Sequence, residues 1–208
     1  MKGKQDYIQN IAEIRSMMER SSKFLSLSGL AGIMAGIYAL IGAYIAYRIL
    51  DFNPDEIFYS HTVTGTFSSS LVEVIFLAVF ILAMAIGTAI WLSYKKANIR
   101  GEKIWNASAK QLLMTMAVPL LAGGILVIVM ISHGLFGLIA PVTLIFYGLA
   151  LFNASKFTYE ELKFLGLIQI GLGLISSYFI GFGLLFWALG FGLVHIIYGT
   201  YMHYRYER

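Results

Sequence analysis

Two polar residues, Gln169 and His195, stand in the last two long apolar stretches of this chain, residues 162–180 and 182–203. Consecutive antiparallel helices would bring the two side chains to similar depth and into hydrogen-bond range. Because histidine titrates near neutral pH, the pair could line a polar site or carry a proton. Alternatively, it forms one interhelical hydrogen bond that holds the two helices together.

A weaker group of ionisable residues is predicted at the exterior side. Glu73 lies near the start of the apolar stretch 71–93, and His61 lies in the loop that precedes this stretch. His133 lies in the turn after residues 111–132. A histidine with carboxylates could bind zinc or another divalent ion. However, these residues come from separate segments, and neither HExxH nor paired HxxxH spacing occurs. We therefore predict no metal site, and Glu73 facing the outer headgroups is the simpler interpretation.

Signatures of enzymes and of cofactor proteins are absent from the sequence. There is no GxSxG elbow, P-loop or pair of intramembrane aspartates. Cysteine is missing, which excludes disulfides, thiolate metal sites and a cysteine nucleophile. Haem held by two histidines requires a matched partner for His195 on a facing helix, and none is available. We therefore expect a non-enzymatic protein without a cofactor.

Six long apolar stretches carry these residues. A helix of roughly 20 mostly apolar residues crosses about 30 Å of hydrocarbon, and it satisfies its own peptide groups there. Hydrophobic residues make up 59% of the 208 residues, whereas charged residues make up only 12%, well below the share in soluble domains. We predict an all-α, polytopic integral membrane protein whose six transmembrane helices cover residues 24–48, 71–93, 111–132, 134–153, 162–180 and 182–203.

The basic residues outside these stretches predict the orientation of the protein in the membrane. If the chain crosses the membrane at each stretch, 14 of the 15 Lys and Arg residues fall on one side, and Arg48 alone falls on the other. The positive-inside rule makes the basic side cytoplasmic, with both termini inside. This distribution also accounts for the formal net charge of +4, so nucleic-acid binding is not predicted.

The first 23 residues have a different pattern from the rest. Ile8, Ile11, Ile14 and Met18 recur at helical spacing, with polar residues on the other faces. This pattern predicts an amphipathic helix on the cytoplasmic membrane surface, ahead of a transmembrane domain at residues 24–208. The helix is either a surface anchor or a docking element for a cytoplasmic protein partner.

Small residues follow one face of the first apolar stretch. Gly32, Gly36, Ala39 and Ala43 lie on two stripes with four-residue spacing. Small side chains let helices approach closely in a membrane, where lipid removes the hydrophobic drive for association. The face could pack inside one protomer, or it could form the seam of a homo-oligomer.

Two prolines are predicted to kink their helices. Pro119 and Pro141 each lack a backbone donor within an apolar stretch. Kinked helices beside glycine-rich ones could enclose a cavity or act as a hinge. Together with Gln169, His195 and Tyr198, the two prolines are our candidates for a ligand or polar cavity.

Both ends of the chain resemble one group of proteins. The stretches ERSSKFLSLSGL (19–30) and LFWALGFGLVHIIYG (185–199) are similar to an uncharacterised family of small bacterial six-span membrane proteins. The glycine-rich hairpins resemble, more loosely, the HdeD-like six-span proteins linked with acid resistance. The resemblance implies a multi-pass protein of the bacterial cytoplasmic (inner) membrane, and it implies no activity or site residue.

Two functions follow as hypotheses. The first is a non-enzymatic membrane protein that binds or transports a small solute in a cavity within the helix bundle. The second is a membrane-embedded sensor or accessory subunit, which would act through the N-terminal helix and residues 94–110 at the cytoplasmic face. In both cases the lipid bilayer surrounds most of the chain.

Overall fold

The computed structural model describes residues 23–52, 69–99, 101 and 105–207. The predicted N-terminal helix and His61 lie outside these ranges. Every regular element of the described part is a helix. The α-helices are α2 (Gly29–Arg48), α4 (Ser69–Ile99), α5 (Ala107–Ser132), α6 (Ile139–Ala154), α7 (Leu162–Tyr178), α8 (Gly183–Trp187) and α9 (His195–Tyr206); the short 3-10 helices are η1 (Phe136–Leu138), η2 (Ser155–Phe157) and η3 (Ile180–Phe182), and η4 (Ala188–Val194) is a π-helix.

The helices confirm a multi-pass membrane protein. Within the described ranges, five helical segments are long and apolar enough to cross a membrane: Gly29–Arg48, Leu71–Ile99, Ala107–Ser132, Phe136–Phe157 and Ile180–Tyr206. The remaining apolar helix, α7, is shorter at 17 residues. No residue in the apolar window of α4 is buried, and Phe76, Val79 and Phe80 are among its exposed side chains. Such a surface is suited to lipid contact.

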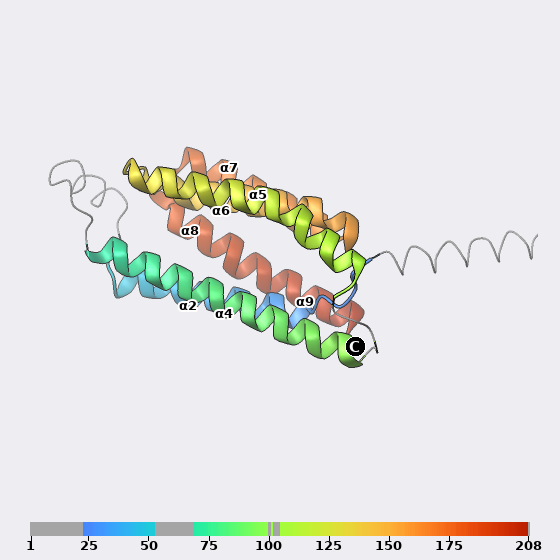
Figure 1. Cartoon of the computed structure of the whole chain (residues 1–208). Coiled ribbons are helices and arrows are strands. Elements are labelled where there is room, and N and C mark those ends of the chain that lie inside the picture. The colour runs from blue at the N-terminus through green and yellow to red at the C-terminus, as the bar shows by residue number, and fades with distance from the viewer. Residues whose placement is uncertain (1–22, 53–68, 100, 102–104, 208) are drawn as a thin grey trace, which may run out of the picture.

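The last helical segment lies at the centre of the bundle. α8, η4 and α9 follow one another without a break, and Figure 1 shows this segment between two groups of helices. On one side α2 packs against η4 and α9, with α4 outside it. On the other side α6 and α7 pack against α8 and η4, with α5 outside α6. The central segment therefore contributes to both halves of the core.

The small-residue face of α2 packs within the protomer. A Cβ added at Gly29 would lie 2.6 Å from the Gly199 carbonyl oxygen, and one added at Gly36 would lie 2.6 Å from that of Gly192. Ala39 and Ala43 are 3% and 8% exposed. This is the first of the two predicted arrangements. A homo-oligomer seam on the same face would have to displace α9.

The first apolar stretch becomes helical later than predicted. Residues 24–28 are not helical, and α2 begins at Gly29. The Phe24 N–H donates to the Phe157 carbonyl at 2.7 Å, while Thr158 Oγ1 donates to the Phe24 carbonyl at 2.7 Å. Tyr159 Oη donates to the Leu25 carbonyl at 2.6 Å. These distant partners satisfy backbone groups that would otherwise favour a helix.

One of the two prolines lies at a different place in its helix from that predicted. Pro141 is the third residue of α6, within the first turn, where an α-helix uses no backbone donor. The expected kink from Pro141 is therefore wrong, because the helix begins later than the apolar stretch. Pro119 does lie inside a helix, and α5 continues past it to Ser132.

A carboxylate near the C-terminus joins three segments at one end of the bundle. Glu207 Oε1 accepts from the Gly29 N–H at 2.8 Å and from Lys96 Nζ at 2.9 Å, and its Oε2 accepts from His203 Nδ1 at 2.7 Å. Lys96 Nζ also donates to the Leu27 carbonyl at 2.6 Å. We call this end, where α2 begins and α4 and α9 finish, the basic end.

Candidate functional site

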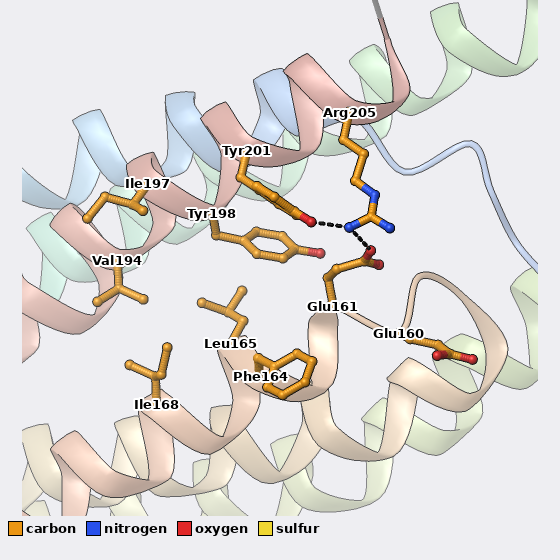
Figure 2. A pocket seen from close by; sticks show the side chains of 10 residues that line it. All are labelled: Glu160, Glu161, Phe164, Leu165, Ile168, Val194, Ile197, Tyr198, Tyr201 and Arg205. Atoms are coloured by element: carbon orange, nitrogen blue, oxygen red, sulfur yellow. Dashed lines mark hydrogen bonds and ion pairs between the residues drawn. The ribbon is translucent and has the colours of Figure 1, made fainter.

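A cavity of about 500 Å³ lies between α7 and α9. Its walls are mainly apolar, and its polar groups gather at the basic end, where α7 begins and α9 finishes (Figure 2). The apolar lining consists of Phe164, Leu165 and Ile168 of α7 with Val194 of η4 and Ile197 of α9, while the polar lining consists of Glu160, Glu161, Tyr198, Tyr201 and Arg205. The cavity is therefore amphipathic along its length.

Glu161 and Arg205 link the two walls of the cavity at its polar end. Arg205 Nη1 lies 3.2 Å from Glu161 Oε1 and also donates to the Tyr201 hydroxyl (Figure 2). Tyr206 Oη donates to the same Glu161 oxygen at 2.7 Å. Among the described residues no donor is recorded for the second oxygen, Oε2. That carboxylate therefore keeps acceptor capacity for a further donor.

The hydroxyl group of Tyr198 is a second unsatisfied polar group at this site. Figure 2 shows its ring extending from α9 toward α7, with the oxygen toward Glu161. The oxygen is buried and has no hydrogen-bond partner among the described residues. Burying a hydroxyl without a partner costs free energy, which a bound group could recover. Tyr198 is the one predicted cavity residue that lines this cavity.

Gln169 and His195 do meet, in a buried network beside the cavity rather than in its lining. The exposed fractions of Gln169 and His195 are 0% and 5%. Gln169 Nε2 donates to the Gly190 carbonyl at 2.7 Å, and His195 Nδ1 lies 2.9 Å from the same oxygen. Tyr147 Oη lies 3.0 Å from His195 Nε2. Gly190 belongs to the π-helix η4. Backbone hydrogen bonds in a π-helix join residues five apart, whereas those in an α-helix join residues four apart.

The contacts of His195 identify its tautomer. A carbonyl oxygen only accepts, so the Gly190 contact places a proton on Nδ1. Nε2 then accepts from the Tyr147 hydroxyl. Gln169 Nε2 and His195 Nδ1 lie 3.3 Å apart, but both are donors, and both donate to the Gly190 oxygen instead of to each other. The geometry therefore supports the structural interpretation of this pair, a link between α7 and the central segment that Tyr147 extends to α6.

We expect the two polar residues of this network to contribute unequally to stability. His195→Leu should lower the free energy of unfolding by about 1–2 kcal/mol, because it leaves the Tyr147 hydroxyl without an acceptor. Gln169→Leu should change it by less than about 1 kcal/mol. In the Gln169→Leu variant, His195 still donates to the Gly190 carbonyl, and the substitution removes the unpaired Gln169 Oε1. Denaturant unfolding in detergent micelles measures both; equal losses would contradict this assignment.

Among the described residues, no recorded contact brings together Glu73 and His133 of the weak exterior group. Glu73 lies in the first turns of α4 and is exposed. His133 Nδ1 is within hydrogen-bond distance of the Val129 carbonyl, 2.9 Å, and of Ser132 Oγ, 3.1 Å. The described residues contain no group of three His, Cys, Asp or Glu residues that could hold a metal ion.

Several site residues did not emerge from the sequence. Glu161 and Arg205 lie at the ends of apolar stretches, where charges are usual, so only the fold, which brings the start of α7 near the end of α9, reveals the pair. For Tyr147 the sequence does contain a pattern that could have found it, because residues 145–148 and 196–199 share the motif Ile-x-Tyr-Gly. In both copies the glycine lies at a close helix crossing, Gly148 against Gly166 and Gly199 against Gly29.

Comparisons of this chain with protein-family models, with curated proteins and with solved structures find no match. The hydropathy of the helices shows a multi-pass membrane protein. The cavity between α7 and α9 is a candidate ligand site within the described part of the chain.

Proposed function

We propose that the chain crosses the cytoplasmic membrane of a bacterium six times, with both termini inside. α7 would be the sixth span, since 17 helical residues extend about 25 Å, close to the hydrocarbon thickness. The positive-inside rule supports cytoplasmic placement of the basic end, and the resemblance at residues 19–30 and 185–199 supports a bacterial membrane. Residues 1–23 would form the interfacial helix ahead of the transmembrane domain at 24–208.

We further propose that the protein is a non-enzymatic membrane protein that binds a small ligand between α7 and α9. The amphipathic cavity carries this proposal, because its volume of about 500 Å³ falls within the usual range of ligand sites. Its apolar walls and few polar groups at one end are also typical of such sites. The unpartnered hydroxyl of Tyr198 supports an occupant with a polar group there.

The site between α7 and α9 supports binding more strongly than transport. The cavity lies beside the buried network of Gln169 and His195, and neither residue lines it. Transport of a small solute stays a hypothesis that requires a second conformation. The alternative of a sensor or accessory subunit needs residues 1–22, which lie outside the described part of the chain.

Filling the cavity should release its ligand. We expect the wild-type protein, extracted gently from native membranes, to carry a small-molecule adduct in native mass spectrometry. Ile197→Trp should reduce the adduct severalfold, because the larger ring occupies the cavity. Ile90→Trp is the matched control, since both isoleucines are 60% exposed and Ile90 lies on α4, away from the cavity.

A second variant separates blocking from misfolding. Ile168→Trp fills the cavity from α7, and Ile168 is 48% exposed, so replacement leaves the buried core in place. All variants should elute as wild type does in gel filtration. Equal adduct in wild type, Ile90→Trp and both cavity variants would contradict the proposed function, as would wild-type protein without any adduct.

A further inference from the structure

We propose that the ligand of this cavity is a single-chain amphiphile with a protonated primary amine. Its amine lies at the basic end between Glu161 and Tyr198, and its chain follows α7 and α9. This inference rests on the proposed function and names the class of ligand. The length of the cavity, the unsatisfied polar atoms and the charges of its lining each contribute to it.

The length of the cavity favours a ligand that occupies one leaflet. Its lining along the central segment runs from Val194 to Arg205. Eleven helical steps of 1.5 Å correspond to about 16 Å. The hydrocarbon core of a bilayer is about 30 Å thick, so the cavity reaches from one surface to about the midplane. A chain that is anchored at one surface matches this extent.

The unsatisfied polar atoms select the head group. Glu161 Oε2 can only accept hydrogen bonds, and its partners Arg205 and Tyr206 both donate to Oε1. The Tyr198 oxygen faces the same carboxylate but makes no hydrogen bond (Figure 2). An ammonium group has three donors and no acceptor, so one group placed between these oxygens can donate to both. A hydroxyl head has only one donor.

The charges that line the cavity favour a cation over an anion. Two carboxylates, those of Glu160 and Glu161, line it with one guanidinium, that of Arg205. Arg205 is already engaged with Glu161 and with Tyr201. Glu160 pairs with Lys23 at 3.3 Å, but its side chain is 83% exposed, so that pair contributes little. A carboxylate head in the same place would lie against the Glu161 carboxylate, and the two negative charges would repel each other.

Spin-labelled single-chain probes test the head group directly. Full-length protein in phosphatidylcholine nanodiscs is titrated with stearyl chains that end in an amine, a carboxylate or an alcohol, and electron paramagnetic resonance measures the immobilised fraction. We expect the amine probe to bind about tenfold more tightly than the carboxylate probe, the equivalent of one charge-assisted hydrogen bond. Unlabelled lysophosphatidylethanolamine, which has one chain, distinguishes the source of the amine: displacement indicates a lipid head group, and no displacement indicates a free amine.

Variants assign this preference to the cavity. Ile197→Trp should abolish the preference for the amine, and Tyr198→Phe should reduce it severalfold while folded yield stays unchanged, because the lost hydroxyl has no protein partner. Ile90→Trp should keep it. If the carboxylate or alcohol probe binds as tightly as the amine and Ile197→Trp still releases it, the ligand class is wrong and the proposed function stands. If Ile197→Trp changes the binding of none of the three probes, both proposals fail.

Discussion

Gly199→Ala is expected to separate α2 from α9 and to lower the free energy of unfolding by about 3 kcal/mol. The added Cβ would lie 2.6 Å from the Gly29 carbonyl oxygen and 2.6 Å from the Ile33 backbone nitrogen. Both are main-chain atoms, so no side-chain rotation can relieve the clash. The crossing sets how α2 lies against the central segment, and the effect should therefore extend to the whole bundle. Thermal or denaturant unfolding in detergent measures it.

Gly87→Ala provides the matched control. A Cβ at Gly87 of α4 meets no atom within 4 Å. Alanine is the better helix former, so this variant should be unchanged or more stable by about 0.5–1 kcal/mol. If Gly199→Ala proves as stable as Gly87→Ala, the close crossing of α2 and α9 is wrong.

Glu207→Ala is expected to lower the free energy of unfolding by about 3 kcal/mol, at the low end for a broken buried ion pair. The side chains of Lys96 and Glu207 are only 12% and 11% exposed. The substitution leaves the Lys96 ammonium without its carboxylate and the first N–H of α2 without an acceptor. Glu160→Ala is the comparison, because Glu160 is 83% exposed and should change stability by less than about 1 kcal/mol.

Acid should reproduce the loss of the Glu207 contacts. Burial alone raises the pKa of Glu207, but hydrogen bonds from His203, Lys96 and Gly29 outweigh it and lower the pKa from 4.5 to about 2. A depressed folded-state pKa gives stability that is complete above pH 4.5 and is lost as the pH falls toward 2. The stability difference between wild type and Glu207→Ala should therefore shrink over this window. A constant difference down to pH 2 would exclude the proposed role of this carboxylate.

The sequence predicts those features of the fold that depend on composition along the chain. Hydropathy locates the apolar helices because lipid exposure needs only apolar side chains in sufficient number. The meeting of Gln169 with His195 follows from their similar depth on consecutive helices. The close packing of Gly32 and Gly36 follows from side-chain size.

Features that depend on distant partners do not follow from such patterns. Residues 24–28 have the hydropathy of a span, yet the carbonyl of Phe157 and the side chains of Thr158 and Tyr159 bind their backbone groups. The cavity likewise depends on where the fold places α7 relative to α9. Glu161 and Arg205, which are 44 residues apart in the chain, become neighbours only through that placement.

Cysteine alkylation tests the central claim, a ligand held between α7 and α9, most directly. The chain has no cysteine, so Ile197→Cys and Ile90→Cys each introduce a single reactive site. A membrane-permeant maleimide is applied to native membranes and to protein stripped of ligand by extensive detergent washing. We predict that alkylation at position 197 is slow in membranes and becomes severalfold faster after washing, relative to position 90. The same relative rate before and after washing would contradict a bound ligand.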